Sequence, residues 1–426
     1  MSPRSERSRL EVAIVLLVFG ALDAMRIASA LPRELFGDEW RYLYYADNLL
    51  HGFYSPRERV FLWNGPGYPL LLLPFVQASC VHAARYANAL WHAGMLAYVW
   101  ALLQPYVGIR WRVLALLALY FYQPLTSHLP LLYTEVVCCF LLTGWAYHAQ
   151  RGRWHLLIAG VYLGVLCLTK VIFGVALLAW GAILAGLWVY RRAGAIKAQL
   201  QIALLAGLLC VPYLTYTYQL TGRWLYWSSA AGNNFYWLTS PFPEESGDWY
   251  HQGWVRNNPI LRAHHKPIFD LTSGLLQNPN LEDQEQLFNL STPEAADVFV
   301  RAGLENIRKH PLKLARNYLA NLSRLFFDVP TSVRGTPAWN PASVWHGLLL
   351  VWTAGVALLA WRRRSGLPRV FWPSLGFALI ALVAYTASSL SARFLIPFVP
   401  LWWPISCAWL GLAAARAPVD ARAGTV

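Results

Sequence analysis

Two adjacent carboxylates, Asp38 and Glu39, follow the first hydrophobic stretch of the chain. A carboxylate at a membrane boundary can accept a proton from a reacting hydroxyl group. Asp38 could instead cap a helix that begins next to it, because Asp is favoured at that position. Capping would account for only one of the two carboxylates. The pair therefore favours a chemical role, with either residue as the base.

Other ionisable residues lie near the expected outer ends of later hydrophobic spans, on the same side as the carboxylate pair. Each costs about 2.5–3.5 kcal/mol at the centre of a membrane helix, so such residues tend to face a cavity or a partner. They are Arg85, His128, Glu135, Lys170 and Arg393. Two carboxylate sites and three cations on one rim suit the binding of an anionic group and the removal of a proton. Any single one could equally mark the interface, with its charged end reaching water.

The elements that must position these residues are membrane helices. The 426 residues are 57% hydrophobic and only 13% charged, which is too little charge to cover a soluble surface. Apolar runs near the length needed to span a bilayer recur along the chain. Ten are expected, at 11–31, 82–103, 113–129, 131–149, 155–170, 172–190, 200–219, 342–361, 370–388 and 395–415. The predicted fold is an all-α polytopic bundle of about ten transmembrane helices.

The orientation of the bundle follows from its Lys and Arg residues. With a cytoplasmic N-terminus, every inside segment is short and basic, as in the Arg362-Arg363-Arg364 run. Both termini are then cytoplasmic, and the carboxylate rim faces away from the cytoplasm. The net charge of +14 is largely this topology signal, so it does not indicate nucleic-acid binding. A multi-pass protein of the inner (cytoplasmic) membrane is expected.

No cofactor is evident from the sequence. All six cysteines fall in or beside apolar spans, so no disulfide framework is expected in the outer loops. No ligand spacing demands a metal, and none excludes a divalent ion.

Two segments are expected outside the membrane. The second and longer one separates the chain into three parts. The predicted parts are an N-terminal membrane module (1–219) with a first outer loop at 32–81, a loop domain (220–341), and C-terminal membrane helices (342–426). The first loop should begin with an amphipathic helix after Asp38, and residues 68–75 are too short to span. In the second, a helix is expected across 293–327, starting at Thr292-Pro293.

The first outer loop resembles that of polytopic GT-C glycosyltransferases, in particular the bacterial protein O-mannosyltransferase-like and aminoarabinose-transferase-like group. The resemblance is carried by Asp38-Glu39-x-x-Tyr42 and Gly65-Pro66-Gly67-Tyr68-Pro69-Leu70. Later motifs follow in the family's order: Tyr133-Thr134-Glu135, Gly164 to Lys170, Gly232-Asn233-Asn234-Phe235-Tyr236, His310-Pro311, and Arg393 to Pro397.

The resemblance implies inverting transfer of a sugar from a polyprenyl-phosphate sugar donor to an acceptor hydroxyl on the extracytoplasmic face. Asp38 matches the base, Glu39 its support or an acceptor-orienting group, and Glu135 a second acidic position. Donor-phosphate candidates are Lys170 and Arg393, with Arg85 less well matched. The other residues expected to bind substrate are Tyr42, His128, Asn233 and Asn234.

One departure from the pattern affects donor binding. Aminoarabinose transferases carry a basic residue before a Pro-Pro pair in this loop, where the present chain has Asn64-Gly65-Pro66-Gly67. The donor therefore need not be an amino sugar. The expected acceptor is a glycolipid, a polysaccharide or a protein. A transporter or flippase of polyprenyl-linked sugars and a non-catalytic envelope-assembly component remain alternatives.

Overall fold

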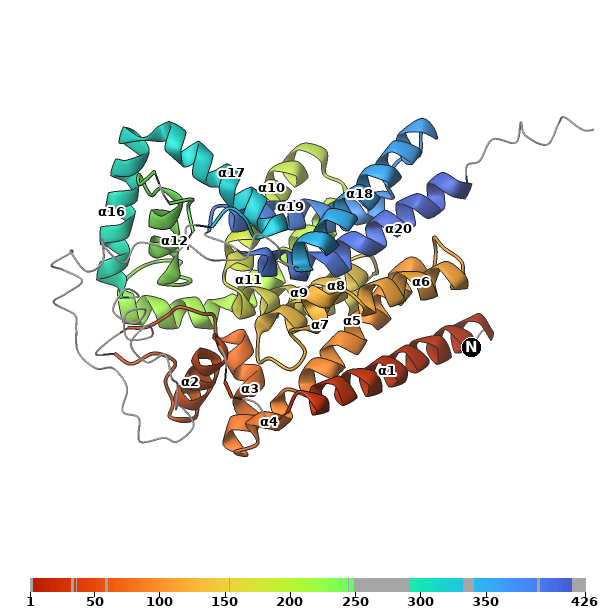
Figure 1. The fold of residues 1–426 in the computed structure, drawn as a ribbon, viewed down its shortest axis with the longest axis horizontal. Helices are drawn as coiled ribbons and strands as arrows, with labels where there is room; N and C mark the ends of the chain where they lie inside the picture. The colour runs from red at the N-terminus through yellow and green to blue at the C-terminus, as the bar shows by residue number, and fades with distance from the viewer. Residues whose placement is uncertain are drawn as a thin grey trace, which may run out of the picture.

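The computed structural model describes residues 3–31, 34–35, 37–57, 60–152, 154–243, 245–248, 292–331, 341–388 and 391–415. Every regular element within these ranges is helical, which confirms the predicted fold class. The helices α1, α6, α18 and α20 extend toward one end of the molecule, and α2, α12 and α16 lie at the other (Figure 1).

The α-helices have the following bounds: α1 Pro3–Ser29, α2 Glu39–Leu50, α3 Gly67–Gln77, α4 Val81–Ala84, α5 Ala87–Leu103, α6 Ile109–Tyr120, α7 Gln123–Thr126, α8 Thr134–His148, α9 Trp154–Thr169, α10 Ile172–Arg191, α11 Gly194–Thr221, α12 Ala230–Leu238, α16 Pro293–Lys309, α17 Pro311–Phe327, α18 Pro341–Arg362, α19 Trp372–Thr386 and α20 Val399–Ala415. Two 3-10 helices, η1 Arg369–Phe371 and η2 Ala392–Phe398, precede α19 and α20.

Each expected span coincides with one helix or with two consecutive helices, but not all of these helices are long enough to cross a bilayer alone. Within the described residues, six helical segments are long and apolar enough: Leu10–Ser29, Ile172–Arg191, Gly194–Thr221, Pro341–Arg362, Arg369–Thr386 and Ala392–Ala415. The other four, α5, α6, α8 and α9, have 17, 12, 15 and 16 residues. A count of ten spans therefore stays a prediction.

Three predicted helices are interrupted, and two of the breaks have a local cause. The span expected at 113–129 ends at Tyr120 and resumes as α7, with Pro124 in its first turn. The helix expected across 293–327 is two helices, because Pro311 disfavours a helical backbone at His310. The span expected at 82–103 is split around Arg85 into α4 and α5, and nothing in the structure explains that break.

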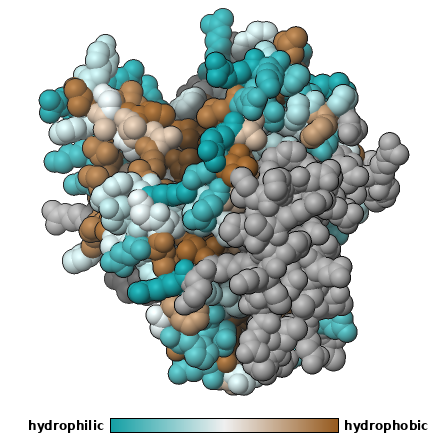
Figure 2. Space-filling model, turned by 90° about the vertical axis from the view of Figure 1, so that its left-hand side faces the viewer, coloured by the Kyte–Doolittle hydropathy of each residue, from teal (hydrophilic) through white to brown (hydrophobic). Residues whose placement is uncertain are grey.

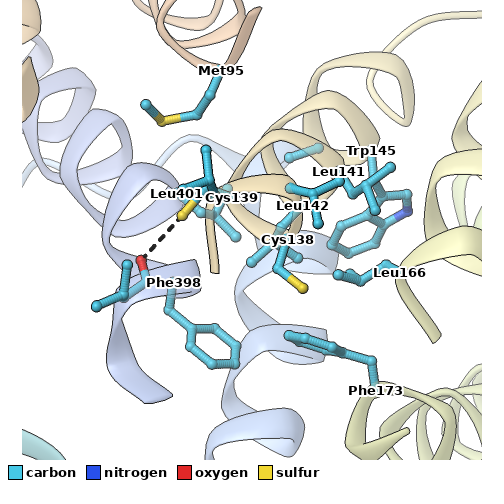
Figure 3. Packing of buried hydrophobic residues seen from close by; sticks show 14 of the residues in the cluster. Met95, Cys138, Cys139, Leu141, Leu142, Trp145, Leu166, Phe173, Phe398 and Leu401 are labelled. Carbon is cyan, nitrogen blue, oxygen red and sulfur yellow. Dashed lines mark hydrogen bonds between the residues drawn. The ribbon is translucent and has the colours of Figure 1, made fainter. Parts of the chain in front are cut away.

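A continuous hydrophobic core joins the helices that carry the candidate site residues. Figure 3 shows Cys138, Leu142 and Trp145 of α8 packed among side chains of neighbouring helices. The Cys139 thiol donates to the Ile396 carbonyl in η2, at 3.5 Å between sulfur and oxygen. Since α8 and η2 share this core, the residues at their outer ends are held at fixed separations.

The region between α11 and α18 contains a second, small core. Tyr236 and Trp237 of α12 pack against Ala295 and Phe299 of α16. The first outer loop is joined to it, because Leu62 and Ser229 exchange hydrogen bonds. This second core and the first outer loop therefore form one connected structure at the end of the bundle.

Candidate active site

Asp38 lies immediately before α2, but its side chain makes no hydrogen bond that caps the helix. The carboxylate instead accepts hydrogen bonds from Arg41, one turn along α2, and from Arg393 of η2, whose Nη2 is 2.9 Å from Oδ2. The capping interpretation is therefore wrong, and Asp38 binds two guanidinium groups.

Glu135 and Lys170 complete the cluster around Arg393. Glu135 lies in the first turn of α8, and Lys170 follows the last residue of α9. The Lys170 ammonium donates to Glu135 Oε1 at 2.8 Å, and Arg393 Nε lies 3.4 Å from the same oxygen. Arg393 thus links the two carboxylates that the sequence placed 97 residues apart, Asp38 and Glu135. We call Asp38, Arg41, Glu135, Lys170 and Arg393 the charged cluster.

Aromatic rings line the charged cluster. The Lys170 ammonium lies 4.7 Å from the centre of the Phe394 ring, and the Arg393 guanidinium carbon lies 5.0 Å from the centre of the Tyr133 ring. A cation over an aromatic face is stabilised by the ring's quadrupole, the more so where water is excluded. The rings therefore help to hold both cations in place.

The carboxyl group of Asp38 is charged in this setting and partly open to solvent. Burial raises its pKa, but Arg41 and Arg393, with a further contribution from Lys170, outweigh that effect and lower the pKa to about 2. The side chain is 22% exposed, against 2% for Glu135. Asp38 is therefore the carboxylate of the cluster that a substrate could reach.

Tyr42 lies beside the charged cluster and is buried. Burial, together with the charges of Asp38 and Glu135, raises the pKa of its hydroxyl group above its usual range. Its hydroxyl oxygen is 3.5 Å from the donor nitrogen of Asn64, and its ring packs edge-on against Tyr68. The neutral phenol thus connects the cluster to the loop at 64–67.

Glu39 points away from the cluster, although it is adjacent to Asp38 in the chain. Its side chain is fully buried and accepts a hydrogen bond from the Leu132 N–H at 2.8 Å. Arg85, only 1% exposed, donates to it at 3.4 Å. This buried ion pair connects α2 to the segments before α5 and α8. The structure therefore separates Arg85 from the phosphate-binding candidates Lys170 and Arg393.

The loop at 64–67 lies directly on the end of α9. A Cβ atom added to Gly65 would be 2.1 Å from the Leu168 carbonyl oxygen, and one added to Gly67 would be 2.6 Å from the Thr169 nitrogen. Such contacts require glycine, because any side chain would displace the backbone of α9. The Gly65-Pro66-Gly67 motif thus sets the position of the residue that follows, Lys170.

The remaining sequence candidates lie at different distances from the cluster. The His128 ring packs against Tyr133, which itself faces Arg393. Asn233 and Asn234 lie on α12, which packs against α16, and Asn233 is fully buried. Within the described residues, the side-chain amide of Asn233 makes no hydrogen bond, so no such bond ties it to the charged cluster.

Arg41 was not among the residues singled out from the sequence. Its spacing of three from Asp38 would place both side chains on one face of a helix beginning at Glu39, so a signal was present. For a metal, the described ranges contain no group of three or more His, Cys, Asp or Glu residues that could hold an ion.

Figure 2 views the end of the molecule at which α2, α12 and α16 lie. Its described surface shows hydrophilic and hydrophobic residues side by side. This mixed surface is typical of a region at or beyond the membrane boundary.

No family model matches the chain, and no curated protein matches it. Among solved structures it is similar to the oligosaccharyltransferase AglB from Archaeoglobus fulgidus in complex with an inhibitory peptide and a dolichol-phosphate, with 15% identity, a TM-score of 0.45, and coverage of 96% of this chain and 50% of that one. It is also similar to ArnT from Cupriavidus metallidurans bound to undecaprenyl phosphate, with 15% identity, a TM-score of 0.38, and coverage of 94% and 77%. The chain spans about half the length of the archaeal protein. One of these neighbours is thus an oligosaccharyltransferase, and both were solved with a polyprenyl-type lipid phosphate.

Proposed function

We propose that the protein is an integral membrane glycosyltransferase of the GT-C type. It would move a sugar from a polyprenyl-phosphate donor to an acceptor hydroxyl, with inversion at the anomeric carbon. One observation carries the proposal: a partly exposed carboxylate, Asp38, lies in a single cluster with two cations, Lys170 and Arg393, at the end of a membrane bundle. This set suits removal of a proton beside an anionic leaving group.

In the proposed step, the acceptor oxygen attacks the anomeric carbon while the bond from that carbon to the phosphate oxygen breaks. The acceptor proton passes to Asp38, and the bonding electron pair leaves with the lipid phosphate. Lys170 and Arg393 stabilise the charge that develops on the phosphate, because fixed cations act most strongly on charge that grows in the transition state. Glu135 holds both cations in position.

Asp38 is a weak base while Arg41 and Arg393 both contact it. A donor phosphate bound at Arg393 would compete with the carboxylate for the guanidinium group. Loss of that ion pair would raise the pKa of Asp38 and make it a better proton acceptor. We therefore propose that donor binding precedes activation of the base, and that Glu39, buried against Arg85, supports the fold.

The proposed site faces the extracytoplasmic side of a cytoplasmic membrane, with both termini inside. Transporters tend to carry their ionisable residues near the middle of interrupted helices. Here Asp38, Glu135 and Lys170 lie before α2, in the first turn of α8 and after α9. Since these are helix ends, the arrangement favours an enzyme over a transporter, and the Asp38→Asn variant below separates an enzyme from an assembly scaffold.

The test compares purified wild type with Asp38→Asn in lipid vesicles. Each is offered a panel of radiolabelled polyprenyl-phosphate sugars, with a membrane-envelope extract as acceptor. Wild type should transfer label from one donor, whereas Asp38→Asn should bind that donor and transfer at least a hundredfold less, because an amide cannot accept the proton. Equal transfer by both proteins would remove Asp38 from the mechanism. Movement of labelled lipid across the bilayer without transfer would support a transporter.

A further inference from the structure

Helix α17 buries several polar residues together with Leu325, and its most exposed side chains include leucines. Asn317 and Asn321 are fully buried and Arg324 is 2% exposed, whereas Leu312 and Leu319 are 85% and 64% exposed. A helix at a water-facing surface has the opposite arrangement, with its apolar stripe toward the core.

The preceding helix, α16, provides an internal comparison. It has the same length as α17, 17 residues, and it also exposes two apolar side chains, Val300 at 39% and Leu304 at 52%. Phe299 and Ala295 face inward, while the ion pair of Glu305 and Lys309 is exposed on the outside. The two helices are joined at His310-Pro311, and they differ in what they bury: α17 buries Asn317, Asn321 and Arg324, whereas the buried residues of α16 are apolar or glycine.

The polar side of α17 is explained by the backbone groups that it meets. Asn317 donates to the carbonyls of Leu238 and Ser240, at 2.9 and 3.0 Å. Asn321 donates to the Thr386 carbonyl at the end of α19, at 3.0 Å. These bonds satisfy carbonyls that would otherwise be buried without partners. They fix which side of α17 faces inward, and the leucines are therefore left outside.

The C-terminal end of α17 is joined to a candidate membrane span. At its C-terminal end, the Phe327 carbonyl accepts from the Ser343 hydroxyl of α18 at 2.7 Å. Further along α18, which is long and apolar enough to cross a bilayer, Leu348 and Val351 are 58% and 72% exposed. The exposed leucines of α17 extend this apolar surface toward the charged cluster's end of the bundle.

Charged residues of α16 and α17 fit the same surroundings. Arg316 is exposed on α17 beside the leucines, and Arg308 and Lys309 are exposed at the end of α16. Basic residues beside an apolar stripe are typical of helices that lie at the boundary between lipid headgroups and acyl chains.

We infer that the outer face of α17, formed by Leu312, Leu319 and Leu322, lies against acyl chains in the bilayer leaflet on the side of the charged cluster. This helix is then part of the membrane-embedded body, whereas the sequence placed it in an extracytoplasmic loop domain whose apolar content suggested that it also leans on the membrane. The inference does not depend on the proposed transferase activity.

Site-directed fluorescence quenching tests the inference. Cys80 is the one exposed cysteine of the six, so a Cys80→Ser background allows a single new cysteine to be labelled with an environment-sensitive dye. The test position is Leu319→Cys, with Leu322→Cys as an independent second position on the same face. The matched controls are Val351→Cys on α18 for lipid and Glu305→Cys on α16 for water.

The labelled proteins are placed in vesicles that contain brominated phospholipid, and iodide is added to the water in a parallel sample. Both α17 positions should be quenched by brominated lipid as strongly as Val351→Cys, and severalfold less by iodide than Glu305→Cys. Iodide quenching equal to that of Glu305→Cys would overturn the inference, since the face would be in water. Little quenching by either agent would also overturn it, since protein would then cover the face.

Discussion

Asp38 and Glu39 are neighbours in the chain, yet we expect their replacement to have different consequences. Glu39 is fully buried, and its carboxylate holds the buried Arg85 and the Leu132 N–H. Glu39→Ala should therefore act on folding, whereas Asp38→Asn should act on the reaction. The prediction is that Glu39→Ala lowers stability strongly, while the molecules that remain folded still transfer sugar.

The magnitude follows from the contacts of Glu39. Removing one partner of a buried ion pair costs about 3–5 kcal/mol, because the other charge is left without compensation. The exposed fractions of 0% for Glu39 and 1% for Arg85 place this pair in that class. A loss of about 4 kcal/mol corresponds to roughly a thousandfold change in the ratio of folded to unfolded protein. Replacing both residues by Met should cost less than either single replacement, since no unpaired charge remains.

The assay measures the free energy of unfolding in mixed micelles, together with the transfer rate per folded molecule. Glu39→Gln, which keeps the shape of the side chain, is the control for the loss of charge alone. The reasoning would be refuted if Glu39→Gln were as stable as wild type and yet unable to transfer sugar. Glu39 would then be the base that we assign to Asp38.

Three further outcomes are expected. The pKa of Asp38 is about 2, so its carboxylate stays charged from pH 7 to pH 4, and kcat/KM should not fall over that range. Arg41→Met removes one of the charges that lower this pKa, so the acid limb of the pH–rate profile should move upward toward 3.8. Gly65→Ala should lower transfer and thermal stability, whereas Gly181→Ala, with nothing near its added Cβ atom, should change neither in the same assays. Arg393→Lys keeps the positive charge but loses the planar guanidinium group that contacts both Asp38 and Glu135. Initial rates of transfer should therefore fall about a hundredfold. An unchanged rate would show that the charge alone suffices.

The sequence predicted the helices well, because hydrophobic runs and helix-start signals are local. The start at Thr292-Pro293 is confirmed, with the Thr292 hydroxyl oxygen accepting from the Ala295 N–H. The number of spans was harder to predict, since α8 is central and buried, and a helix surrounded by protein can be shorter than the bilayer. The orientation of α17 could not be predicted either, because it depends on the carbonyls of Leu238 and Thr386, which are distant in the chain.

For the candidate site, residue type and expected side of the membrane were enough to select Asp38, Glu135, Lys170 and Arg393. Residue type and side of the membrane could not separate Asp38 from Glu39, because the two adjacent side chains contact different partners, Arg393 and Arg85. The distinction depends on where Arg85 and Arg393 lie in space, which the sequence of the loop does not specify. The roles of these residues remain predictions until the variants are measured.

The charged cluster contains three positive and two negative side chains, so its net charge at rest is one positive unit. A phosphodiester donor carries one negative charge, and its complex with the cluster would be electrically neutral. When the proposed reaction is complete, Asp38 holds a proton and the cluster carries two positive charges, while the released phosphate monoester approaches two negative charges. The total stays at zero from bound donor to product, so no charge has to enter or leave the site during the chemical step.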